Sequence, residues 1–190
     1  MSQGHPWLRF DIGVGALPHR LADDPRPWQQ TVSDLHGRWY DGVAPPAVAD
    51  VFVLQWLLQV PAHTAATAAA AGPWRVEGLD DLTFTRTGTG VPAIVRLTTV
   101  VPGDGDLGTR LERAEADYRA LAAPLAAGYA ARVPLGRRTR GALVDDMWAE
   151  ADRQARGAAP PTSRRSCCLI YALPGCHECA GCPRVAGNSR

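Results

Sequence analysis

All five cysteines of this chain lie between residues 167 and 182, and this clustering constrains the fold more than any other feature of the sequence. Two adjacent cysteines, Cys167 and Cys168, are followed after ten residues by the Cys-x2-Cys loop of Cys179 and Cys182. Such a loop lets two thiolates converge on one metal without backbone strain. A second cysteine pair within a dozen residues makes the pattern far more specific. The sequence therefore predicts a metal centre near the C-terminus.

The residues between the two cysteine pairs suggest how the pairs meet. The run 169–173 is apolar and can pack on the rest of the protein, and Pro174-Gly175 forms a turn that brings the second pair back to the first. The fifth cysteine, Cys176, creates an alternative Cys-x2-Cys loop with Cys179. Both arrangements stay open at this point.

Several kinds of site could use these cysteines. Structural zinc would bind the same thiolates, although zinc sites usually present two spaced loops and rarely use adjacent cysteines. Disulfides are disfavoured in a reducing cytoplasm, where closely spaced cysteines are more often metal ligands. The spacing also differs from those of the common four-iron and plant-type ferredoxins.

Composition and charge restrict which binding partners and which cellular compartment are expected for this protein. The formal net charge is +1, so no global field favours nucleic acid or an anionic membrane. The N-terminus lacks the apolar stretch of a secretory signal. The most apolar run, 48–60, is interrupted by polar residues and is too short to span a bilayer. We expect a cytoplasmic protein, and a peripheral membrane association is compatible with the sequence.

The rest of the chain predicts helices around a small hairpin. Helical spacing of apolar residues, Pro and Gly stops, and a Thr109-x-x-Glu112 capping box define the expected helices. These are 28–39, 47–59 with an alanine-rich continuation after Pro61, a helix opened by Thr109 that Pro124 could split, and 139–156. Two β-prone runs, 82–87 and 93–101, flank the turn at Gly88-Thr89-Gly90.

These elements predict an α+β fold, in which a helical body carries a small antiparallel β-sheet and a C-terminal cysteine-rich, metal-binding segment. We divide the chain into a body, residues 1–157, which would dock the substrate, and a second part, residues 158–190. The second part begins with a linker, 158–163, and continues as the cysteine segment.

The cysteine segment resembles the C-terminal signature of the FhuF-type ferric siderophore reductases. The resemblance lies in 164–171, in Leu173-Pro174-Gly175 and in 179–183. It implies a 2Fe–2S cluster whose ligands are Cys167, Cys168, Cys179 and Cys182. Weaker similarity extends to 54–66 and 136–146. Cys176 stands where the family commonly has glycine.

The resemblance also implies an activity: one-electron reduction of a ferric siderophore, of the hydroxamate type, in the cytoplasm, with release of Fe(II). No Rossmann glycine fingerprint is present. Electrons are therefore expected from a separate donor, such as a ferredoxin or an NAD(P)H-dependent reductase. Two alternatives stay open: a 2Fe–2S electron carrier or redox sensor without siderophore turnover, and a structural zinc module.

Charged residues surround the predicted ligands. Arg164, Arg165 and Arg184 would stabilise the reduced, more negative cluster and raise its potential, unless they are ordinary solvated cations. His177 lies inside the ligand loop, but a Rieske-type cluster needs two histidines and no second one is near. We therefore do not predict His177 as a ligand.

Overall fold

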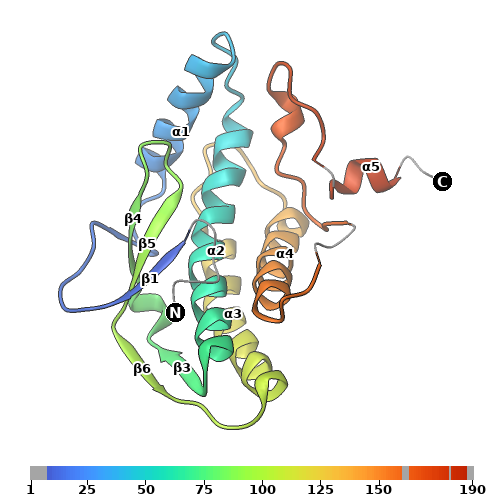
Figure 1. Ribbon diagram of the computed structural model, residues 1–190. Helices are drawn as coiled ribbons and strands as arrows, with labels where there is room; N and C mark the ends of the chain where they lie inside the picture. The colour runs from blue at the N-terminus through green and yellow to red at the C-terminus, as the bar shows by residue number, and fades with distance from the viewer. Residues whose placement is uncertain (1–7, 160–162, 180, 188–190) are drawn as a thin grey trace.

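A long central helix organises the fold of this protein (Figure 1). The structure is a computed structural model and describes residues 8–159, 163–179 and 181–187. The central helix is α2 (Pro46–Ala71), which is buried on most of its surface. A helix that is hydrophobic on all sides is stable only inside a protein. Three other helices pack around it. They are α1 (Arg26–Trp39), α3 (Leu107–Gly128) and α4 (Arg137–Ala155).

Both internal prolines are accommodated within continuous helices. The sequence predicted that Pro61 would kink or end its helix and that Pro124 could split another, yet α2 and α3 each run through their proline. A proline inside a helix costs about 3 kcal/mol because it removes one hydrogen bond and crowds the preceding turn. Burial of α2 on nearly every side outweighs that cost.

The strands form two small sheets. The larger has the order β1-β5-β4-β2 and the smaller pairs β3 with β6. The strands are β1 (Arg9–Ile12), β2 (His19–Arg20), β3 (Trp74–Glu77), β4 (Thr83–Arg86), β5 (Pro92–Leu97) and β6 (Thr99–Pro102). The predicted hairpin is confirmed: β4 and β5 are antiparallel, with Phe84 opposite Val95. Gly90 closes the turn with a positive φ of 87°, which favours glycine.

Two features of the sheets depart from the expectation. The sheet is antiparallel except where β1 pairs with β5 in parallel, and β1 comes from a Pro- and Gly-rich region to which no strand was assigned. The predicted run 93–101 is also divided at Thr98. Its first part belongs to β5 and its second to β6, in the other sheet.

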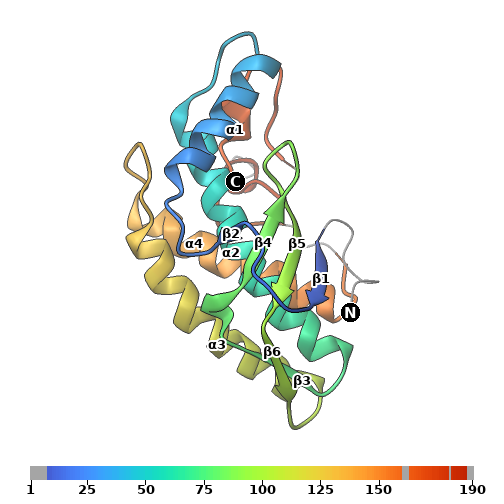
Figure 2. The same cartoon turned by 90° about the vertical axis from the view of Figure 1, so that its left-hand side faces the viewer.

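The sheet and the cysteine segment lie on opposite sides of α2. Phe84 and Val95 on the sheet are buried in one core with Leu54 and Leu58 of α2. Figure 2 shows the larger sheet in front of the helices, whereas Figure 1 shows the cysteine segment beside α4, away from the sheet. The segment contains the short helices η3 (Ile170–Ala172) and α5 (Pro183–Gly187). The middle of the expected linker, 160–162, lies outside the described residues.

Helix α3 begins earlier than predicted. Its N-cap is Asp106, whose carboxylate accepts a hydrogen bond from the backbone N–H of Thr109 at 2.8 Å. Thr109 therefore lies in the first turn, and the predicted Thr109/Glu112 capping box is wrong by three residues. Asp is as good an N-cap as Thr, so both positions carried a valid signal.

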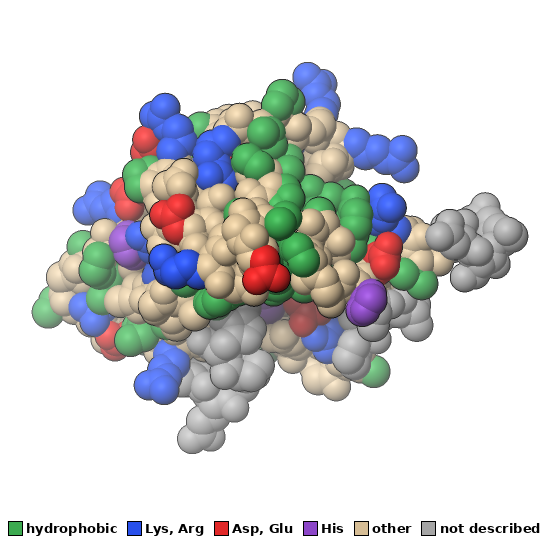
Figure 3. All heavy atoms as spheres, turned by 90° about the horizontal axis from the view of Figure 1, so that it is seen from above, with side chains coloured by type: hydrophobic (Ala, Val, Ile, Leu, Met, Phe, Trp, Pro, Cys, Tyr) green, Lys and Arg blue, Asp and Glu red, His purple; other side chains and the backbone are tan. Residues whose placement is uncertain are grey.

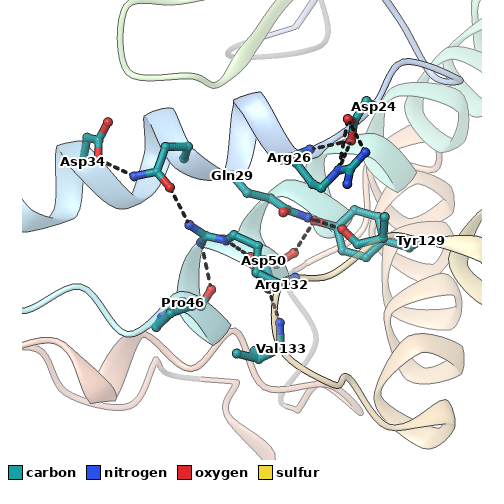
Figure 4. A network of polar contacts seen from close by, with 11 residues as sticks. Asp24, Arg26, Gln29, Asp34, Pro46, Asp50, Tyr129, Arg132 and Val133 are labelled. Carbon is teal, nitrogen blue, oxygen red and sulfur yellow. Dashed lines mark hydrogen bonds and ion pairs between the residues drawn. The ribbon is translucent and has the colours of Figure 1, made fainter.

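A fully buried carboxylate joins the N-terminal half of the body to the loop between α3 and α4 (Figure 4). Asp50 of α2 accepts hydrogen bonds from the backbone N–H groups of Arg132 and Val133 at 2.7 and 3.1 Å, and from the Arg132 side chain at 2.8 Å. Tyr129 donates to the Asp50 carbonyl, and Gln29 of α1 donates to Tyr129. Asp50 interrupts the apolar run of α2 because the loop needs a buried acceptor.

None of the helices in the described part of the chain combines the length and the apolar character needed to cross a lipid bilayer.

Candidate metal centre

A buried aspartate of α4 holds the chain just before the first two cysteines. The carboxylate of Asp146, with 8% of its side chain exposed, accepts hydrogen bonds from the backbone N–H groups of Arg165 and Ser166 at 2.9 and 2.7 Å. It also accepts one from the Ser166 hydroxyl at 2.5 Å. The Arg164 guanidinium lies 3.6 Å away. Because charge-assisted bonds are the strong ones, Asp146 positions the entry to Cys167 firmly.

The segment then bends around Cys167. Leu169 has a positive φ of 62°, which is uncommon for a residue with a branched side chain. In this conformation its N–H points to the Cys167 sulfur, with N···S at 3.4 Å. Strained backbone of this kind is kept where the surroundings require it, often at functional sites.

A turn brings the second cysteine pair back to the first. Gly175 has a positive φ of 72°, as expected for the predicted Pro174-Gly175 turn. Beyond it, the Cys182 N–H donates to the Cys179 carbonyl at 2.8 Å, which closes the Cys-x2-Cys loop. The Arg164 N–H donates to the Gly181 carbonyl at 2.7 Å, so the two ends of the segment lie side by side.

The four predicted ligand cysteines meet as a result. The sulfurs of Cys167 and Cys182 lie 3.7 Å apart, and the Cys168 and Cys179 thiols are in hydrogen-bond contact. Cys168 and Cys182 are buried, whereas Cys167 and Cys179 are partly exposed. Among the described residues, no three His, Cys, Asp or Glu side chains converge closely enough to hold a single ion. The close thiol contacts are thus pairwise.

These distances suit thiolates that share a metal. Two thiolates about 2.3 Å from one tetrahedral metal are about 3.8 Å apart. The observed 3.7 Å between Cys167 and Cys182 is close to that value and far longer than a disulfide bond. All five cysteines are free thiols. The donor set and its spacing therefore fit a cluster in which each metal takes two cysteines.

Without metal, the surroundings of Cys167 and Cys179 favour the protonated form of these two thiols. Burial raises the pKa of the Cys167 thiol to about 11, and the neighbouring Cys182 adds to the effect. Burial likewise raises the pKa of Cys179, while the Arg164 guanidinium opposes that rise. Metal binding must displace these protons, so loading becomes weaker as the pH falls.

The fifth cysteine has a different neighbour. Cys176 lies against Tyr40, the C-cap residue of α1, and a hydrogen bond between the two raises the pKa of the Tyr40 hydroxyl. The structure thus places Cys176 beside the body rather than in either of the close thiol pairs. The Cys176-x2-Cys179 alternative gains no support from this arrangement.

The three flanking arginines have unequal positions. Arg164 has 23% of its side chain exposed, packs against Gly181, and donates to Gln55 of α2 at 3.3 Å. Arg165 is 75% exposed and pairs with Asp145. Arg184 lies over the Tyr171 ring and pairs with Glu178 at 3.8 Å. Arg164 is therefore the least solvated of the three arginines. His177, which was not predicted to be a ligand, is exposed.

Asp146 was not identified from the sequence, although a signal for it was present. Leu143 and Met147 were expected to face inward. Asp146 lies three residues after Leu143 and directly before Met147, so it lies on the same buried side of the helix. A carboxylate on the buried side of a helix needs a set of donors. The N–H groups that precede Cys167 supply that set.

Among known proteins, similarity was found for the cysteine segment. Residues 164–184 match the family model described as the FhuF 2Fe-2S C-terminal domain. No curated protein and no solved structure matches the chain. The match confirms the resemblance seen in the sequence and indicates that the cofactor of this segment is a 2Fe–2S cluster. The family match covers the cysteine segment, and none of the comparisons matches the body.

Proposed function

We propose that this protein is a cytoplasmic ferric siderophore reductase, with Cys167, Cys168, Cys179 and Cys182 as the ligands of its 2Fe–2S cluster. The observation that carries the proposal is the FhuF-type segment, 164–184, whose four thiols lie together in cross-segment pairs. The substrate would be a ferric siderophore of the hydroxamate type. The electron would come from a separate ferredoxin or NAD(P)H-dependent reductase.

The proposed chemistry needs one electron and breaks no bond of the siderophore. Hydroxamate oxygens are hard ligands that favour Fe(III) over the softer Fe(II), so reduction weakens the complex and releases the metal. A bound 2Fe–2S cluster supplies one-electron transfer. The residues of the chain would hold that cluster close to the surface, since Cys167 and Cys179 are partly exposed.

The surface near the cysteine segment suits a docking role for the body. Trp39 and Val43, at the end of α1 and in the loop before α2, are exposed. Tyr40, between them, contacts Cys176 of the segment. Figure 3 shows this end from above, with hydrophobic side chains in a band and arginines on both sides of it. The proposal assigns substrate docking to this end.

The activity itself is testable. We expect the anaerobically reduced protein to transfer one electron per cluster to a ferric trihydroxamate siderophore. Fe(II) should then appear in a ferrous-specific chelator. The rate should saturate with siderophore concentration, because docking on the body precedes transfer. Stopped-flow absorbance of the cluster and of the Fe(II) chelate would measure both steps.

Two controls separate the proposal from its alternatives. A variant without the cluster should show no turnover, and a colourless, zinc-loaded protein would replace the proposal with a structural zinc module. If reoxidation is slow, does not saturate and is equally fast with simple ferric chelates, the protein is instead an electron carrier or redox sensor.

Arg164 should raise the potential of the cluster. Its partly buried guanidinium lies close enough to Cys179 to act on that thiol, and a nearby cation stabilises the reduced, more negative state. Arg164→Gln is therefore expected to lower the midpoint potential while the cluster stays assembled. Arg165→Gln and Arg184→Gln serve as matched controls and should change the potential much less, because these side chains are more solvated. Redox titration followed by paramagnetic resonance measures the midpoint potentials of all three variants. Equal shifts in the three would contradict the larger effect expected for Arg164.

A further inference from the structure

The two cysteine pairs lie on antiparallel arms. We define the first arm as residues 164–168 and the second arm as residues 179–182, of which the structure describes all but Ala180. The chain reverses at Gly175, and the Arg164 N–H donates to the Gly181 carbonyl at 2.7 Å. In such a reversal, residues nearer the turn oppose each other, and residues farther from it oppose each other.

This nesting specifies which thiols pair. Cys168 and Cys179 are nearest the turn on their arms, and Cys167 and Cys182 are farther from it. The contacts follow the same order, with Cys168 against Cys179 and the sulfurs of Cys167 and Cys182 at 3.7 Å. The order of the arms therefore agrees with the sulfur distance of the outer pair and with the thiol contact of the inner pair.

In the alternative pairing, cysteines that are neighbours in the sequence would share a metal, Cys167 with Cys168 and Cys179 with Cys182. In extended backbone, consecutive side chains point to opposite sides, which disfavours a shared tetrahedral site for adjacent cysteines. The left-handed backbone at Leu169 turns the chain around Cys167 alone, since the Leu169 N–H bonds that sulfur. The two adjacent thiols thus have different contacts: Cys167 accepts from the Leu169 N–H, and Cys168 contacts Cys179.

We propose that each iron of the cluster joins the two arms, with Cys167 and Cys182 on one iron and Cys168 and Cys179 on the other. The inference rests on the proposed ligand set but goes beyond it. Each iron then has one buried and one partly exposed thiolate. Neither iron is held by one arm alone, so the cluster ties the second arm to the arm that Asp146 anchors.

Spectroscopy of serine variants tests the pairing in the loaded protein. Serine oxygen is a harder donor than thiolate and favours Fe(III), so the added electron should reside on the other iron. In the cluster that each variant retains, Cys167→Ser and Cys182→Ser should give one common reduced-state Mössbauer and paramagnetic resonance pattern. Cys168→Ser and Cys179→Ser should share a second pattern. Grouping of Cys167→Ser with Cys168→Ser would overturn the proposal.

Disulfide formation provides a second readout if the variants retain too little cluster. In full-length, metal-free protein carrying Cys176→Ser, double serine variants leave two thiols to be oxidised by a mild catalyst. The pairs Cys167/Cys182 and Cys168/Cys179 should crosslink roughly tenfold faster than Cys167/Cys179, because disulfides require close sulfurs. Equal rates would overturn the pairing. A wild-type protein that binds no 2Fe–2S cluster would instead overturn the proposed function, which this crosslinking assay does not test.

Discussion

Serine at any one of the four predicted ligand positions is expected to abolish the cluster or deplete it severely. Each of Cys167→Ser, Cys168→Ser, Cys179→Ser and Cys182→Ser replaces a soft thiolate with a hard alkoxide. Each also leaves an unpaired thiol where the structure has a close pair. Iron and sulfide content, with the visible absorption spectrum, measures the loss. Turnover of ferric siderophore should fall in proportion to the cluster that remains.

Cys176→Ser is the matched control for that series. Cys176 lies three residues from Cys179, but its side chain contacts Tyr40 rather than the paired thiols. Cluster content should therefore stay near that of the wild type. The proposed ligand register would be wrong if Cys176→Ser lost the cluster while Cys168→Ser or Cys182→Ser kept it.

Asp146→Ala should have the second largest effect, although Asp146 is not a ligand. The variant leaves two backbone N–H groups and the Ser166 hydroxyl without their buried acceptor, and it leaves Arg164 without a carboxylate 3.6 Å away. Breaking a buried charged interaction of this kind costs on the order of 3–5 kcal/mol. We expect the first arm to detach and most of the cluster to be lost.

The adjacent aspartate provides a control on the same helix. Asp145 pairs with the side chains of Arg119 and the exposed Arg165 rather than with the backbone of the arm. Asp145→Ala should therefore keep the cluster, since exposed ion pairs contribute little. Hydrogen exchange over 163–179 should rise in Asp146→Ala and not in Asp145→Ala, while far-ultraviolet circular dichroism stays near that of the wild type. A normal cluster in Asp146→Ala would refute the anchoring role.

The sequence predicted the parts of the structure that depend on local patterns. The four main helices, the β4–β5 hairpin and the α+β class follow from apolar periodicity and turn residues. The metal segment was recognised because cysteine spacing restricts what a site can be, and the family match agrees with it.

The parts that could not be predicted depend on contacts distant in the sequence. The parallel pairing of β1 with β5 joins residues more than eighty positions apart. The continuity of α2 through Pro61 depends on burial by other helices. The inward position of Asp146 on its helix was a sequence signal, but what its carboxylate binds was not, because the donors are backbone groups distant in the sequence.

The position of the cysteine segment outside the main core has a consequence for how the protein matures. The described core is built from the body, and from the cysteine segment Leu169 alone packs against it. Burial that stabilises the body therefore does not depend on iron. We therefore expect the body to fold without iron and cluster delivery to follow as a separate step. The supply of iron and sulfide would then control how many folded molecules are competent.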